Sequence, residues 1–97
     1  MPTFSTKMTK TISGTGVTDA CEMSGPFSVY IANPSGSSVK VEYSADNVTF
    51  RDFIVSGSPL AYSSAACDVI NNRGTMWFRW NCTSYGSTPF ELTMAGH

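Results

Sequence analysis

The residues with the clearest potential for binding are Trp77 and Arg79, two positions apart in the segment 76–82. Alternate residues of an extended strand point to the same face, so this pair shares the face opposite Phe78 and Trp80. Tryptophan, tyrosine and arginine are enriched where protein partners dock. We therefore expect a protein interface; the competing interpretation is that a sheet edge or a stacked arginine covers Trp77. The candidate contact residues are Trp77, Arg79, Tyr85, Tyr30, Tyr62 and Phe4.

The sequence contains no arrangement that predicts catalysis. The single histidine is the terminal His97, which leaves no credible base for a nucleophilic triad. A glycosidase needs two carboxyl groups in different environments, but the three glutamates are expected to face solvent on strands. They are Glu22, Glu42 and Glu91. We expect no enzyme activity, no catalytic residue and no cofactor.

Metal binding has little support from the spacing of ligands. Asp46, Asp52 and Asp68 could supply the oxygen atoms that Ca²⁺ prefers, but they match no calcium-loop spacing. Asp46 is expected to form a turn instead. We therefore expect no metal site.

Three cysteines, an odd count, cannot all pair within one chain. They are Cys21, Cys67 and Cys82, and no C-x-x-C motif is present. We interpret them as three small buried hydrophobic residues. The alternative is one disulfide and one free thiol.

The composition is that of one small β-rich domain. The chain has 97 residues, 13% of them charged, a net charge of −1, and 25 serines and threonines against two leucines. A balanced charge argues against binding to nucleic acid or to an anionic membrane. Residues 1–16 lack the apolar segment of a secretory leader, and no run is long enough to span a membrane. We expect the chain to be made in a reducing cytoplasm.

Alternating apolar and polar residues predict short strands. The clearest alternation runs through 39–43 and 76–82, and Gly, Pro, Ser and Asn clusters separate the segments every 8–12 residues. This pattern predicts an all-β domain, an antiparallel two-sheet sandwich of jelly-roll or Ig-like type. We expect a flexible arm at 1–6 and one domain at 7–97. The expected strands are 8–12, 17–23, 27–31, 39–43, 48–55, 67–70, 76–82 and 90–94.

The expected core is contributed by the apolar faces of the middle and late strands. It comprises Val29, Ile31, Val39, Val41, Tyr43, Phe78, Trp80, Phe90 and Leu92. Two segments are irregular. Asp19 interrupts the apolar face of 17–23, which predicts a bulge or an edge, and a bulge near Arg51 and Asp52 would restore alternation in 48–55. Residues 57–65 are expected to form the longest loop.

The segment 39–50 (VKVEYSADNVTF) resembles a V-x-V-x-x-S-x-D-(G/N)-x-T-(F/W) hairpin of small β-sandwich virion proteins of tailed bacteriophages. Three more segments are similar to that family, in the same order along the chain. They are Thr11 to Gly16, Gly25 to Val29 (G-x-F-x-V) and the aromatic-arginine run Trp77 to Trp80. A similar hairpin occurs in discoidin-like sugar-binding domains, which are longer.

The resemblance implies a decoration or cement protein that binds the capsid or another virion surface. Such proteins are commonly dimers or trimers, so the expected partners are further copies of the chain and a major capsid or other virion protein. No individual site residue transfers from this family. Two alternatives stay open: a carbohydrate-binding module that aids host attachment through a glycan, and a host-directed inhibitory binding protein.

Overall fold

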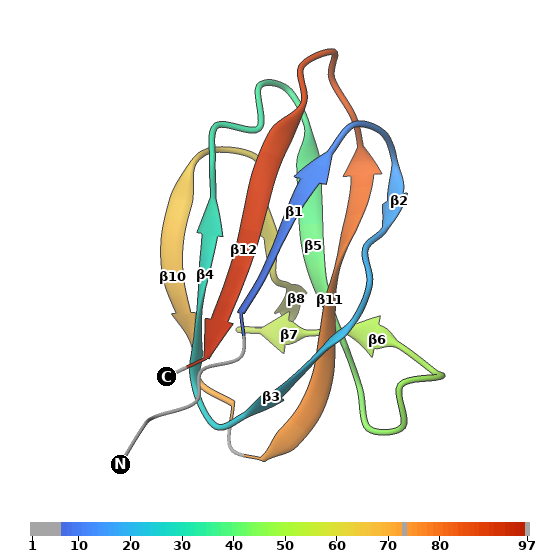
Figure 1. Cartoon of the computed structure of the whole chain (residues 1–97), viewed down its shortest axis with the longest axis vertical. Coiled ribbons are helices and arrows are strands. Elements are labelled where there is room, and N and C mark those ends of the chain that lie inside the picture. Colours follow the sequence, from blue (N-terminus) through green and yellow to red (C-terminus); the bar gives the residue numbers. More distant parts are fainter. Residues whose placement is uncertain (1–6, 73, 97) are drawn as a thin grey trace.

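The computed structural model describes residues 7–72 and 74–96, which form antiparallel sheets with no helix in these ranges (Figure 1). The arm predicted at residues 1–6, including Phe4, lies outside the described residues. The strands are β1 (Lys7–Ile12), β2 (Gly16–Val17), β3 (Cys21–Ser24), β4 (Phe27–Ile31), β5 (Ser38–Ser44), β6 (Arg51–Asp52), β7 (Ile54–Val55), β8 (Ser58–Pro59), β9 (Ala61–Tyr62), β10 (Ala66–Ile70), β11 (Thr75–Ser84) and β12 (Phe90–Gly96).

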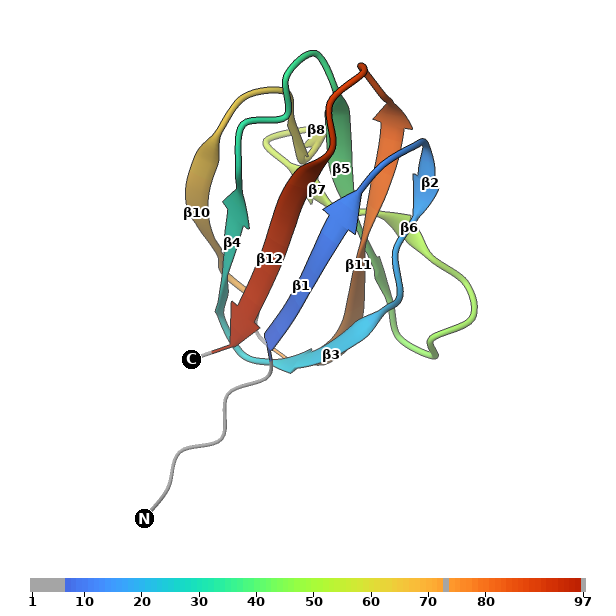
Figure 2. The same ribbon diagram turned by 45° about the horizontal axis from the view of Figure 1, so that its top comes forward.

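Two sheets make up the sandwich (Figure 2). Sheet A has the strand order β1-β12-β4-β10. Sheet B is built on the long pairing of β11 with β5. The short strands β2 and β3 pair one after the other along β11, and β6 and β9 do the same along the other side of β5. Each sheet therefore has four strand positions, two of which in sheet B are filled by pairs of short strands.

The chain passes between the sheets in jelly-roll order. Along the sequence, the eight strand positions lie in sheets A, B, A, B, B, A, B and A. Sheet A thus places the first, eighth, third and sixth positions side by side, and sheet B the second, seventh, fourth and fifth. This is the double Greek key of a jelly roll. The predicted antiparallel sandwich is confirmed. The described residues form twelve strands instead of the expected eight, because two positions are each filled by a pair of short strands and β7 and β8 form a separate two-stranded sheet.

Large side chains from both inner faces fill the space between the sheets. Phe27 of β4 packs on Phe78 of β11 with ring centres 4.5 Å apart, and both are fully buried. Burial of one side chain of this size stabilises the fold by about 1.5–3 kcal/mol. One of the nine predicted core residues, Tyr43, is only partly buried and packs against Phe53. The other eight are buried as predicted: Val29, Ile31, Val39, Val41, Phe78, Trp80, Phe90 and Leu92.

The segment 17–23 is not one strand. Thr18 leaves the regular ladder, donating its N–H to the Trp80 carbonyl at 2.9 Å and accepting the Trp80 N–H on its hydroxyl at 3.1 Å. Val17 is consequently 52% exposed instead of facing the core with Cys21 and Met23. The irregularity predicted from Asp19 is confirmed, because the break between β2 and β3 contains this residue.

The predicted strand 48–55 and the loop 57–65 are also organised differently. Arg51 and Asp52 pair regularly with β5, so the bulge predicted there is wrong. The irregularity lies further along, where residues 54–59 form the β7–β8 hairpin between Phe53 and Leu60. Ser56 and Gly57 both have positive φ (54° and 82°), as a type I′ turn requires. Part of the expected loop is thus strand, and Leu60 and Tyr62 pack against the core.

Candidate functional site

Trp77 and Arg79 lie on the outer face of sheet B, as predicted. Strand β11 alternates strictly in its second half, where Phe78, Trp80 and Cys82 are buried between the sheets. Trp77 and Arg79 therefore point outward, and both are partly exposed. Trp77 lies opposite Ser44 of β5 on one side and Glu22 of β3 on the other.

Arg79 is held in place by Glu42 of the neighbouring strand. The two residues face each other in the β11–β5 register, and Arg79 Nε donates a hydrogen bond of 2.7 Å to Glu42 Oε1. Asn81 Nδ2 donates to the other carboxylate oxygen at 3.1 Å. The Glu42 residue is only 7% exposed, which makes the prediction of a solvent-facing Glu42 wrong. The cause is the contact of its carboxylate with the side chains of Arg79 and Asn81 from β11.

The charge at this site is balanced locally. Lys40 Nζ is 2.7 Å from Asp52 Oδ1 and 3.9 Å from Glu42 Oε2. The pKa of Lys40 is raised, first by the hydrogen bond to Asp52 and also by the negative charge of Asp52 and Glu42. Together with Arg79, two bases and two acids form one network. We call Trp77, Arg79, Asn81, Lys40, Glu42, Ser44 and Asp52 the Glu42 face.

An aromatic ring completes the support of Arg79. The guanidinium carbon lies 3.9 Å from the centre of the Phe50 ring, a cation–π contact. Phe50 comes from the connection between β5 and β6, outside either strand. The competing interpretation from the sequence includes an arginine stacked on Trp77. The structure has a stacked arginine, Arg79, but it covers the Phe50 ring. The guanidinium and the ring are both fixed before any partner arrives.

Asp46 organises the turn that delivers Phe50. Its Oδ1 accepts hydrogen bonds from the N–H groups of Val48 (2.9 Å) and Thr49 (3.0 Å) and from the Ser44 hydroxyl (2.8 Å). These hydrogen bonds lower the pKa of Asp46 to about 2, and the bond from the Thr49 N–H has the largest effect. Asn47 takes a positive φ of 60° at the tip. The S-x-D-N-x-T-F pattern thus fixes a loop conformation, as the turn role predicted for Asp46 requires.

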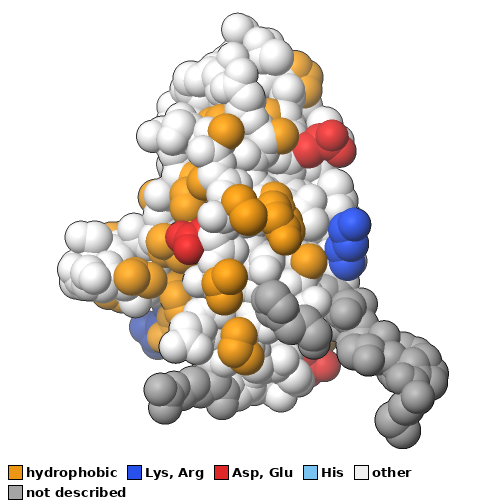
Figure 3. All heavy atoms as spheres, turned by 90° about the vertical axis from the view of Figure 1, so that its left-hand side faces the viewer, with side chains coloured by type: hydrophobic (Ala, Val, Ile, Leu, Met, Phe, Trp, Pro, Cys, Tyr) orange, Lys and Arg blue, Asp and Glu red, His pale blue; other side chains and the backbone are white. Residues whose placement is uncertain are grey.

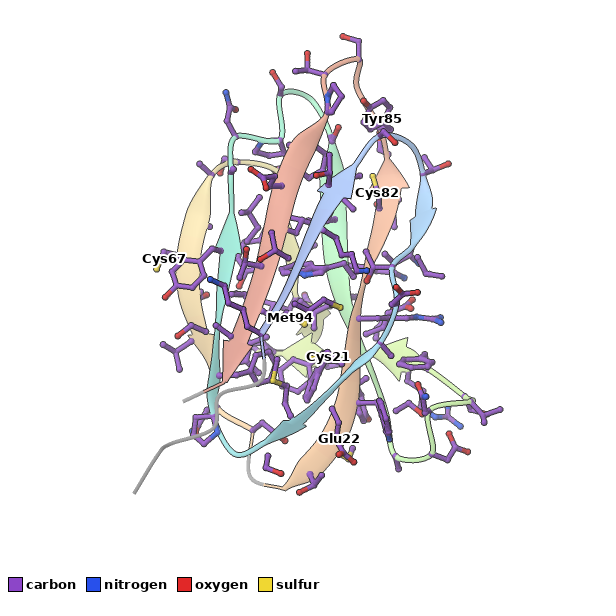
Figure 4. The ribbon with its side chains drawn as sticks, in the orientation of Figure 1. Cys21, Glu22, Cys67, Cys82, Tyr85 and Met94 are labelled. Carbon is purple, nitrogen blue, oxygen red and sulfur yellow. The ribbon has the colours of Figure 1, made fainter. Side chains whose placement is uncertain are left out.

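The candidate tyrosines occupy three different places. Tyr30 is on the outer face of sheet A, away from the Glu42 face, because its neighbours Val29 and Ile31 point into the core. Tyr62 packs with Trp80 (6.2 Å between ring centres) and donates its hydroxyl to Asp68 Oδ2 at 3.0 Å. Burial, followed by this hydrogen bond, raises the pKa of Tyr62. Tyr85 packs against the core beyond the end of β11 (Figure 4).

The three cysteines are free, and their environments differ. Cys21 and Cys82 are buried, and burial raises the pKa of each thiol. Cys67 is exposed on β10, so the interpretation of three buried cysteines is wrong for this residue (Figure 4). Its side chain lies opposite Tyr30 on the outward face of an edge strand.

The three aspartates considered for calcium do not share a site. Asp46 binds its own loop, Asp52 binds Lys40, and Asp68 binds Tyr62. Within the ranges 7–72 and 74–96 no group of three or more potential ligands gathers around a common point. The same ranges contain no helix long and apolar enough to cross a membrane. A surface hollow of about 400 Å³ lies around residues 10–19, between β1 and β2.

No family model matches the sequence, and no match was found among the curated proteins or the solved structures. Sequence reasoning found Trp77 and Arg79 but missed Glu42 and Phe50, which hold Arg79 in place. The alternation in β5 places Glu42 on the face opposite Val41. It does not identify Arg79 as the residue that Glu42 contacts on the neighbouring strand.

Proposed function

We propose that this jelly-roll domain is a non-enzymatic accessory protein of a virus particle, which decorates or cements the capsid through protein contacts. The observation that carries the proposal is the fixed Phe50–Arg79–Glu42 arrangement with Trp77 on the same strand face. An arginine that is already held in place loses little side-chain freedom on binding, and a tryptophan beside it offers a large contact surface.

Two general properties support this proposal. The Glu42 face carries equal numbers of acidic and basic groups already paired with each other, so a partner can cover it without leaving a net buried charge. Jelly rolls are used in viral capsid proteins, and also in lectins and cupins, so the fold agrees with the resemblance of the 39–50 hairpin without selecting the function.

Mass spectrometry of purified virus particles from cells that produce this chain provides the first test. We expect the chain at a fixed ratio to the major capsid protein. The second test is co-sedimentation of the purified chain with particles stripped of it. Trp77→Ala should reduce binding about tenfold or more, whereas Thr83→Ala, at an exposed position near the end of β11, should not. Absence from the particles would refute the proposal.

Tyr30 favours a second candidate, a carbohydrate-binding module. The residue is 43% exposed and lies between Thr93 and Cys67 on a sheet surface, where a sugar ring could stack on the tyrosine ring. A glycan array, read with the wild-type chain and Tyr30→Ala, tests this candidate. Glycan binding that the substitution abolishes, together with absence from virus particles, would replace the first proposal by the second.

A further inference from the structure

The outer face of sheet A carries few charges. Its side chains are mostly hydroxyls and small groups around one exposed tyrosine. Seen from the side of β10, hydrophobic side chains spread over the middle of the molecule and charged ones are sparse (Figure 3). We call the outer face of sheet A the Tyr30 face; it comprises Lys7, Thr9, Thr11, Ser28, Tyr30, Ala32, Cys67, Val69, Glu91, Thr93 and Ala95. Ser28 is the one member that is buried, with 7% of its surface exposed.

The strand registers arrange these residues in rows across the sheet. The central row consists of Thr9, Thr93, Tyr30 and Cys67, each opposite the next on the neighbouring strand. The row on one side begins with Lys7, opposite Ala95. The row on the other side begins with Thr11, opposite Glu91. The only base of the Tyr30 face and its only acid thus lie on opposite sides of the central row.

Lys7 and Glu91 are too far apart to pair within one copy. Ala95, the cross-strand partner of Lys7, is four residues from Glu91 along β12. At roughly 3.3 Å per residue, this separation is about 13 Å. Neither charged group has an ion-pair partner among the described residues. A second copy in the opposite orientation would supply a partner for both.

We propose that two copies of this chain associate face to face through the Tyr30 face, about a two-fold axis that runs across the strands along the central row. This rotation places Tyr30 over the partner's Tyr30 and Cys67 over the partner's Cys67. It exchanges the two outer rows, so that Lys7 of each copy lies beside Glu91 of the other. The two ion pairs are equivalent, as an isologous interface requires. The dimer is independent of the Glu42 face and of the virion role.

The size of the Tyr30 face limits the strength of this dimer. Four strands about 4.8 Å apart and three rows about 6.7 Å apart, with their side chains, cover roughly 400 Å² on each copy. This is about half of the area that each partner contributes to a standard interface. We therefore expect a weak dimer, with a dissociation constant in the range of roughly 10 μM to 1 mM.

Charge reversal tests the proposed pairing directly, by sedimentation equilibrium of the full chain up to about 1 mM. Lys7→Glu alone places two acids together in each contact, and Glu91→Lys alone places two bases together. Each should weaken self-association about tenfold or more. An equimolar mixture of the two variants should associate like the wild type, because every contact in the mixed dimer again joins a base to an acid. Matching melting temperatures control for folding.

Cross-linking tests where the axis lies. Packed sheets are about 10 Å apart, which is too far for a disulfide between the two Cys67 residues but suits a short bis-maleimide. We expect a covalent dimer from the wild type, much less of it from Lys7→Glu, and none from Cys67→Ser. Cys21 and Cys82 remain in that last variant but are buried.

Each remaining outcome contradicts the proposal. A chain that stays monomeric at about 1 mM has no such dimer. A dimer that Lys7→Glu leaves unchanged uses a different face. If the chain remains monomeric and binds a glycan through the Tyr30 face, this face is a sugar-binding surface and not a dimer interface.

Discussion

The Tyr62 hydroxyl donates a 3.0 Å hydrogen bond to Asp68, and this bond joins β9 at the edge of sheet B to β10 at the edge of sheet A. Lys10 of β1 and Asp19, between β2 and β3, form the corresponding contact across the other open side, at 2.8 Å. Each open side of the sandwich is therefore bridged by a carboxylate with one partner from the opposite sheet.

Asp68 also protects the free edge of β10. Its Oδ1 accepts the backbone N–H of Val69 at 2.9 Å, and inward-pointing charges on edge strands oppose pairing with another chain. We expect Asp68→Ala to aggregate faster, because the edge then offers an unpaired N–H beside the exposed Val69 side chain. Light scattering during mild heating measures this. Tyr62→Phe keeps the carboxylate and should aggregate more slowly than Asp68→Ala; equal rates would contradict the edge argument.

Asp46 should make stability depend on pH at the acidic end. Its folded pKa of about 2 is below the ordinary value of 3.8, chiefly because Thr49 donates its backbone N–H to the carboxylate. The ionised carboxylate stabilises the fold at pH values above the pKa that Asp46 has in the unfolded chain. This contribution is lost as the pH falls through the pKa that Asp46 has in the folded chain. The difference in melting temperature between wild type and Asp46→Ala should be full near pH 6, shrink below about pH 4, and be small near pH 2. A difference in melting temperature that stays constant from pH 6 to pH 2 would contradict this role of Asp46.

Removal of Arg79 should destabilise the fold as well as any interface. Glu42 is 7% exposed and would lose its 2.7 Å hydrogen bond, leaving a carboxylate with weaker compensation. We expect Arg79→Ala to cost about 1–3 kcal/mol in urea unfolding. The double variant Arg79→Ala with Glu42→Gln removes the charge that needs compensation and should recover part of the loss. If the double variant is less stable than the single one, Glu42 has another role.

The three thiols should react at very different rates. In native protein at a few micromolar, where we expect monomers, iodoacetamide should modify Cys67 first, because it alone is exposed. Cys21 and Cys82 should react only after unfolding, since they are buried and their pKa values are raised. Mass spectrometry of digested samples taken over time resolves the three sites. Early modification of Cys82 would show that the end of β11 opens.

Alternation predicted the central strands well, because β11 and β5 each have one face against the core. It failed where a side chain replaced a ladder bond, as Thr18 does at Trp80. Neighbouring strands could not be identified from a single sequence. The position of Tyr30 on the other sheet from Trp77, and the contact of Arg79 with Glu42, therefore became evident only from the topology.

The β7–β8 hairpin also makes the chain a natural carrier for foreign peptides. Leu60 donates its N–H to the Phe53 carbonyl at 2.8 Å, and Val41 bonds to both residues, so the ladder closes beneath the hairpin. A sequence spliced between Ser56 and Gly57 would leave these bonds in place. The graft would then be displayed on a tether whose two ends the sandwich already holds together.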